Sequence, residues 1–147
     1  MKLSIIGTGY VGLTTGACFA EVGHEVTCVD NNGEKVRMLL DGKVPIYEPG
    51  LADLVARNVA AGRLKFTTST AEGVRDGDVI FIAVPTPPRE DGSVDLSFIE
   101  KVAREIAESL KPEYGYRVIV DKSTVPVKTG QKVGDTVRRY APAGVEF

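Results

Sequence analysis

The chain has 147 residues, of which 43% are hydrophobic and 26% are charged, as is usual for a globular domain. Lys and Arg number 18 and Asp and Glu number 20, so the net charge of −2 disfavours broad binding to a nucleic-acid backbone. No apolar run approaches the ~20 residues of a membrane-spanning helix, and the N-terminus lacks the features of a signal peptide. We therefore expect a cytoplasmic domain without nucleic-acid or membrane partners.

The first half of the chain alternates short apolar runs with amphipathic patterns. In chain order these predict a strand over 3–6, a helix from about 11 to 22, a strand over 25–29, helices that end at Asp41-Gly42 and near Gly62, and a strand over 64–67. The last of these alternates in polarity, so we expect it to lie near an edge of the sheet.

The second half continues this alternation. It predicts a central strand over 79–84, a helix capped by Asp95 that ends before Lys111, a strand over 116–120, a helix from Pro126 to about Tyr140, and a strand that opens at 144–147. Strands that alternate with helices of this length are typical of right-handed βαβ units. We therefore predict an α/β fold of the Rossmann type, a single domain over residues 1–147 with a doubly wound parallel sheet and helices on both faces.

A glycine-rich turn follows the first predicted strand directly and opens the first predicted helix. Its first glycine permits a tight turn, its second lets the backbone approach a pyrophosphate, and its third lets the helix pack against the strand. The helix N-terminus then offers N–H groups and a partial positive charge to the anion. This GxGxxG segment predicts a dinucleotide site formed by Gly7, Thr8, Gly9, Tyr10, Val11 and Gly12.

Asp30 ends the second predicted strand, 18 positions after Gly12, where dinucleotide-binding domains carry an acid that binds the adenosine ribose. Its carboxylate can accept hydrogen bonds from both ribose hydroxyls and would repel a 2′-phosphate, which favours NAD over NADP. Lys35 is placed to contact the same ribose. Because Lys35 and Arg37 could also meet a 2′-phosphate or simply be solvated, the choice of cofactor stays open here. The structural alternative is a glycine-rich turn with Asp30 as a helix cap.

Two polar loops follow the fourth and fifth predicted strands, at the edge where open α/β sheets bind ligands. Thr86 lies between prolines in the first loop, which is either a cofactor contact or a simple crossover. The second loop, residues 121–126, is either a second anion or reaction site or a segment in which Ser123 or Thr124 caps the next helix. Both roles can hold together.

The two cysteines predict neither a disulfide framework nor a reactive site. Cys18 is expected on the face of the first helix that packs on the sheet, and Cys28 inside a strand, both as small buried hydrophobic residues. The sequence holds no HxxH, CxxC or paired-carboxylate pattern, so no metal site is predicted.

Four segments together resemble successive motifs of the UDP-glucose/GDP-mannose dehydrogenase family, and this resemblance covers nearly the whole chain. The segments are Gly7–Leu13, Val44–Leu51, Val84–Pro87 and Lys122–Pro126. The resemblance implies that NAD is the cofactor, with contacts from Gly7 to Gly12 and from Asp30, Lys35, Thr86 and Thr124. It also implies a catalytic role for Thr124, near the reacting carbon, where its hydroxyl would orient a water or a hydroxyl group.

Members of this family oxidise the C6 alcohol of a nucleotide sugar to a carboxylate in two hydride transfers to NAD+, through a thioester on a cysteine. That cysteine lies downstream in a Gly-Ser-Cys context, which neither Cys18 nor Cys28 has. The resemblance therefore implies an NAD-binding domain cut from a longer, homodimeric enzyme, whose other domains bind the nucleotide sugar. UDP-glucose is the expected substrate. The alternatives are GDP-mannose, UDP-N-acetyl-mannosamine, or a nucleotide-sensing module without catalysis.

Overall fold

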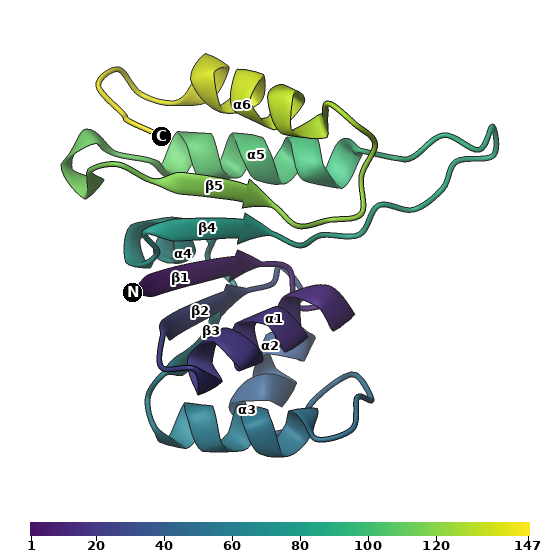
Figure 1. The fold of residues 1–147 in the computed structure, drawn as a ribbon, viewed down its shortest axis with the longest axis vertical. Coiled ribbons are helices and arrows are strands. Elements are labelled where there is room, and N and C mark those ends of the chain that lie inside the picture. The colour runs from purple at the N-terminus through teal and green to yellow at the C-terminus, as the bar shows by residue number, and fades with distance from the viewer.

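The computed structural model describes residues 1–147 and contains a five-stranded parallel sheet between two layers of helices (Figure 1). The strands are β1 (Lys2–Ile6), β2 (Glu25–Val29), β3 (Leu64–Thr67), β4 (Val79–Ile82) and β5 (Val118–Asp121). The helices are α1 (Tyr10–Glu21), α2 (Gly33–Leu40), α3 (Leu51–Ala60), α4 (Thr70–Asp76), α5 (Ser97–Ser109) and α6 (Thr129–Tyr140), with a 3₁₀ turn over Pro112–Tyr114.

The strand order is β3-β2-β1-β4-β5, and every neighbouring pair is parallel. From β1 the chain crosses to one side of the sheet to build β2 and β3, and it then returns to the other side to build β4 and β5. The order therefore reverses between β1 and β4. Their carboxyl ends meet at the kind of crevice where doubly wound sheets bind ligands. The predicted Rossmann-type fold is confirmed.

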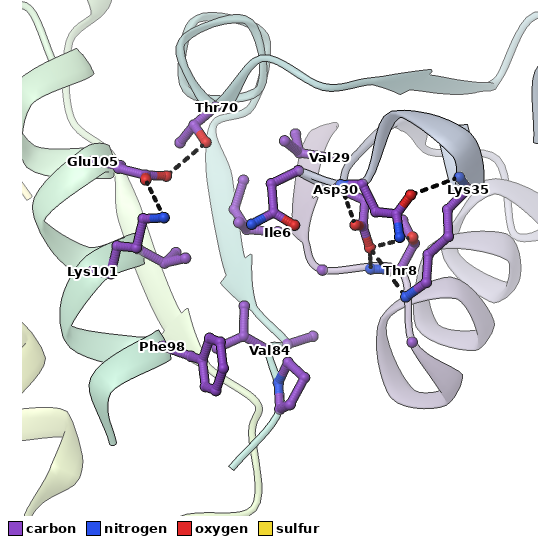
Figure 2. A pocket seen from close by; sticks show the side chains of 17 residues that line it. Ile6, Thr8, Val29, Asp30, Lys35, Thr70, Val84, Phe98, Lys101 and Glu105 are labelled. Atoms are coloured by element: carbon purple, nitrogen blue, oxygen red, sulfur yellow. Dashed lines mark hydrogen bonds and ion pairs between the residues drawn. The ribbon is translucent and has the colours of Figure 1, made fainter. Parts of the chain in front are cut away.

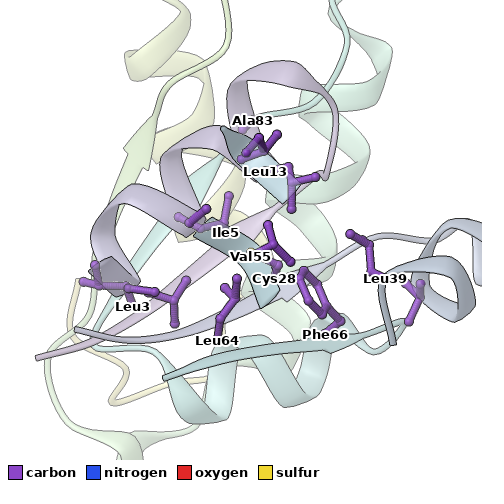
Figure 3. Packing of buried hydrophobic residues seen from close by; sticks show 14 residues of the cluster. Leu3, Ile5, Leu13, Cys28, Leu39, Val55, Leu64, Phe66 and Ala83 are labelled. Atoms are coloured by element: carbon purple, nitrogen blue, oxygen red, sulfur yellow. The ribbon is translucent and has the colours of Figure 1, made fainter. Parts of the chain in front are cut away.

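Each face of the sheet carries its own core. On one face, α1, α2 and α3 pack on the sheet, and Figure 3 shows Ile5, Leu13 and Val55 turned into that core, all of them buried. On the other face, α4, α5 and α6 pack around Ile80 and Ile106, which are also fully buried. Two separate apolar layers on a parallel sheet leave the ends of the strands, and not their faces, open to a ligand. No helix has the length and apolar character needed to cross a membrane.

Four parts of the structure differ from the sequence prediction. Helix α4 was not predicted, the N-cap of α5 is Leu96 instead of Asp95, α6 begins at Thr129 instead of Pro126, and residues 144–147 form no strand. The start of α6 is delayed because the Thr129 amide and hydroxyl both donate hydrogen bonds to the Pro126 carbonyl, which holds a turn ahead of the helix. The terminal segment shares a single backbone hydrogen bond with the region next to β5, from the Arg117 amide to the Glu146 carbonyl at 3.0 Å.

The prediction for the cysteines was right for one and wrong for the other. Cys28 is fully buried in β2, and burial raises the pKa of its thiol to about 12. Cys18 is exposed. The buried face of α1 is formed by residues that include Gly16, Ala17 and Ala20. Cys18 therefore lies on the side of the helix that faces away from the sheet.

Candidate nucleotide-binding site

A cavity of about 270 Å³ lies at the crevice where the strand order reverses. Its walls come from the ends of β1, β2 and β4, from the loops that follow them, and from α4 and α5. Figure 2 shows Asp30, Thr8 and Lys35 on one side and Phe98, Lys101 and Glu105 of α5 on the other. Ile6 and Val29 give the cavity an apolar lining between the two sides.

The glycine turn leaves open space where a ligand would bind. Gly7 has a φ of +107°, and a Cβ atom there would lie 2.3 Å from the Ala83 carbonyl oxygen. A Cβ at Gly12 would lie 1.9 Å from the Gly7 carbonyl oxygen. By contrast, a Cβ at Gly9 would meet nothing within 4 Å. Gly7 and Gly12 are therefore required by the protein itself, whereas Gly9 borders free space.

The N-terminus of α1 faces this space without a side-chain cap. Gly9 is the N-cap residue, and no side chain accepts a hydrogen bond from the first turn. The first amides of a helix have no partner within the helix, and the helix dipole places partial positive charge there. This end of the cavity therefore fits a pyrophosphate, which the backbone can approach because residue 9 lacks a side chain.

Asp30 is already held in place by hydrogen bonds. Its Oδ2 atom accepts from the Thr8 amide at 3.0 Å and from the Thr8 hydroxyl at 2.6 Å, and its Oδ1 atom accepts from the Asn32 amide at 2.9 Å. The Lys35 ammonium lies 3.8 Å from Oδ2. Burial raises the pKa of Asp30, but these hydrogen bonds and the Lys35 charge outweigh it, so the pKa lies below its ordinary value. The carboxylate is ionised at neutral pH.

The two polar loops meet beyond the cavity. The Thr86 hydroxyl donates to the Thr124 carbonyl at 2.8 Å, and the Val84 amide donates to the Ser123 hydroxyl at 3.1 Å. Neither Ser123 nor Thr124 caps α6, because its N-cap is Lys128. The capping alternative for this loop is therefore wrong. The Thr124 hydroxyl has no hydrogen-bond partner within the chain and is free to meet a ligand.

The predicted site residues divide into three groups. Gly7, Thr8, Gly9, Asp30 and Lys35 line the cavity. Tyr10 and Val11 are 57% and 48% exposed on the first turn of α1, and Gly12 is buried below them. Thr86 and Thr124 lie together in the joined loops beyond the cavity. No group of three or more His, Cys, Asp or Glu side chains is placed to hold a metal ion.

The wall formed by α4 and α5 was missed by the sequence prediction. Thr70, Phe98, Lys101 and Glu105 all line the cavity. Lys101 and Glu105 look like ordinary charged positions of an amphipathic helix, and only the packing of α5 against α4 and β4 places them at the cavity. For Thr70 a local signal existed, because Ser69 and Glu72 have the spacing of a capping box. In the structure the Ser69 hydroxyl accepts from the Glu72 amide at 3.2 Å.

The fold and this site define a dinucleotide-binding Rossmann domain. Comparison with known families is more specific, since residues 1–146 match the model described as "UDP-glucose/GDP-mannose dehydrogenase family, NAD binding domain", and the chain belongs to that family. This confirms the predicted family and NAD as the cofactor of the domain.

Relatives and solved structures agree with this assignment. A UDP-glucose 6-dehydrogenase of Rhizobium meliloti is 52% identical over 97% of this chain and 32% of its own length. A UDP-glucose dehydrogenase structure from Pyrobaculum islandicum superposes with a TM-score of 0.92 at 41% identity, over all of this chain and 34% of that one. A GDP-mannose dehydrogenase structure from Pseudomonas aeruginosa gives 0.89 at 37% identity, over 99% and 34%. The chain thus spans about a third of these proteins.

Proposed function

We propose that this chain binds NAD+ across the crevice between β1 and β4. The pyrophosphate lies at Gly9 and the first turn of α1, with amides of Tyr10, Val11 and Gly12 available to it. The adenosine ribose meets Asp30 and Lys35. The observation that carries this assignment is the open space at Gly9 beside Asp30, whose carboxylate is ionised and held by the Thr8 hydroxyl.

The nicotinamide end is proposed to lie toward Thr86 and Thr124. Their loops follow β4 and β5, at the same edge of the sheet as the glycine turn, and the hydrogen bond between them joins the loops. NAD+ supplies the hydride acceptor when it is bound. The Thr124 hydroxyl, which has no partner in the chain, is positioned to orient a reacting hydroxyl group or a water beside it.

The whole protein to which this domain belongs is proposed to oxidise UDP-glucose to UDP-glucuronate with reduction of two NAD+. The support is that several relatives named UDP-glucose 6-dehydrogenase are 48–52% identical to this chain. GDP-mannose is the second candidate substrate, because a GDP-mannose 6-dehydrogenase is 41% identical over 85% of the chain. The substrate would bind through parts of the protein outside this domain.

We further propose that the isolated chain does not turn over substrate. Oxidation from alcohol to acid needs a nucleophile that holds the aldehyde stage, and a thiolate suits that role. Cys28 is buried with a pKa of about 12. Cys18 lies nine positions beyond Gly9 on α1, about 13 Å along the helix from the ligand-binding end.

The whole enzyme is expected to be cytoplasmic and homodimeric. This expectation rests on the proposed nucleotide-sugar substrate and on the family resemblance.

Calorimetric titration of the chain with NAD+ and NADP+ tests the cofactor assignment. NAD+ should bind at least about tenfold more tightly, and Asp30→Ala should remove most of this preference, because the carboxylate both binds the ribose and repels a 2′-phosphate. Equal or tighter binding of NADP+ by the unmodified chain would overturn the role of Asp30. NADH formation from NAD+ and UDP-glucose by the chain alone would contradict the proposed lack of turnover.

A further inference from the structure

We propose that Glu105, held by Thr70, recognises the 6-amino group of the adenine base and so makes this site selective among purines. The proposal rests on the NAD+ assignment above and deepens it, because neither residue belongs to the glycine turn or to the ribose pair. It concerns the wall of the cavity formed by α4 and α5.

Glu105 and Thr70 come from different helices and meet at this wall. The Thr70 hydroxyl donates to Oε2 of Glu105 at 3.2 Å, and the Lys101 ammonium lies 3.9 Å from Oε1. Figure 2 shows both contacts on the side of the cavity opposite Asp30. Asp30 and Glu105 both line the cavity, so a base that is attached to a ribose at Asp30 and directed into the cavity lies between these two sides.

The remaining lining suits the faces of a purine. Figure 2 shows Ile6 and Val29 between Asp30 and Glu105, and Phe98 beside Val84. Val102 of α5 also lines the cavity. The volume of about 270 Å³ lies just below the ~300–1,000 Å³ of pockets for drug-sized ligands, so it fits one half of a dinucleotide and not the whole. Apolar walls bind the ring faces without selecting between purines, which leaves selection to the polar groups at the edge.

The carboxylate of Glu105 determines which purine base can bind with its position-6 edge toward α5. An ionised carboxylate only accepts hydrogen bonds, and it has more acceptor positions than Thr70 and Lys101 occupy. The 6-amino group of adenine is a donor and satisfies one of them. Hypoxanthine carries a carbonyl oxygen at this position, which would face the carboxylate as a second acceptor. A mismatch of this kind leaves both groups unpaired, and that is the source of discrimination.

The experiment uses NAD+ and nicotinamide hypoxanthine dinucleotide. The two differ at position 6 of the base, where a carbonyl oxygen replaces the amino group, and at the adjacent N1, which carries a hydrogen in hypoxanthine. Calorimetry should show that the chain binds the hypoxanthine analogue about tenfold more weakly than NAD+. Glu105→Gln should reduce this ratio to within about twofold, because an amide can donate as well as accept. Thr70→Val should give an intermediate ratio, since the carboxylate remains but loses the hydroxyl that holds it.

Glu108→Gln is the matched control. Glu108 lies on the same helix and accepts from Arg104 at 2.7 Å, but it does not line the cavity, so its substitution should leave the ratio unchanged. Urea denaturation of all three variants separates altered binding from lost folding. Equal binding of the two dinucleotides by the unmodified chain, or an unchanged ratio in Glu105→Gln, would overturn the proposal. Failure of the unmodified chain to bind NAD+ at all would overturn the proposed function as well.

Discussion

Thr8 donates both its backbone amide and its side-chain hydroxyl to a single oxygen of Asp30, at 3.0 and 2.6 Å. The glycine turn and the acid at the end of β2 are therefore one unit, because Thr8 lies between Gly7 and Gly9. Thr8 is fully buried, so this pairing is shielded from competing water. The carboxylate is held toward the cavity before any ribose binds.

Thr8→Val should loosen this unit while keeping the shape of the buried side chain. We expect the affinity for NAD+ to fall about three- to tenfold, since one of the bonds that orients the carboxylate is lost. The pKa of Asp30 should rise, because the hydroxyl stabilises its ionised form. Calorimetry and an NMR titration of the Asp30 carboxyl measure the two effects. Thr15→Val is the control, because Thr15 lies on α1 and its side chain makes no hydrogen bond; it should change neither the affinity nor the pKa of Asp30. An unchanged NAD+ affinity in Thr8→Val would show that Asp30 does not need the Thr8 hydroxyl to bind the ribose.

Gly9 and Gly12 should respond to substitution in opposite ways. Gly9→Val should leave the free energy of unfolding within about 1 kcal/mol of the unmodified chain but remove NAD+ binding, because its side chain enters the open space beside α1. Gly12→Ala should destabilise the fold by about 2 kcal/mol or more, since its Cβ would lie 1.9 Å from the Gly7 carbonyl oxygen. Urea denaturation and calorimetry distinguish the two. Unfolding of Gly9→Val would mean that its role is structural.

The Ser123 hydroxyl connects the two loops by a hydrogen bond to the backbone of the other loop, and removing this hydroxyl should lower the stability of the fold. The Ser123 hydroxyl accepts from the Val84 amide at 3.1 Å and donates to the Ile82 carbonyl at 3.4 Å. Ser123→Ala leaves that partly buried amide unpaired, so we expect a loss of about 1–2 kcal/mol in the free energy of unfolding. Ser93→Ala is the control, because the Ser93 hydroxyl bonds only Asp91 in an exposed turn. A loss equal in both variants would show that the loops are not held together by Ser123.

Glu21 should contribute to the acid sensitivity of the fold. Hydrogen bonds from Arg57 and then from Asn58 lower its pKa from 4.5 to about 2. A carboxyl whose pKa is depressed by folding stabilises the protein above its unfolded pKa, and this contribution is lost as the pH falls toward the folded pKa. Between about pH 5 and about pH 2 the unmodified chain should therefore lose more stability than Glu21→Gln. Urea midpoints across this range measure the difference, and parallel curves would contradict it.

The ribose side of the site could be predicted from the sequence because its parts are local. The spacing of Gly7, Gly9 and Gly12 and the place of Asp30 at a strand end follow from a single β-α-β unit. The wall formed by Thr70 and Glu105 could not be predicted, since it depends on how α4 and α5 pack on each other. Helix α4 escaped prediction for a related reason: it is only seven residues long, and Val74 is its one large buried apolar residue.

The loops beyond the cavity show the same limit. Thr86 and Thr124 were each predicted to face a ligand, but the hydrogen bond between them joins segments that follow different strands. Ser123 was considered as a helix cap, and it bonds the backbone of the other loop instead. Loops rich in proline and hydroxyl residues have no periodic sequence pattern. The order of the strands in the sheet decides which loops lie side by side, and so which hydrogen-bond partners these residues have.

Amide resonances of the ¹⁵N-labelled chain, followed during a titration with NAD+, would locate the cofactor on this fold. We expect the largest shifts at residues 7–12, at Asp30, and along the cavity-facing side of α5 at Val102 and Glu105. The amino ends of the strands, around Glu25 and Arg63, should not shift. Shifts confined to that opposite edge, or none at saturating NAD+, would contradict a nucleotide site at the β1–β4 crevice.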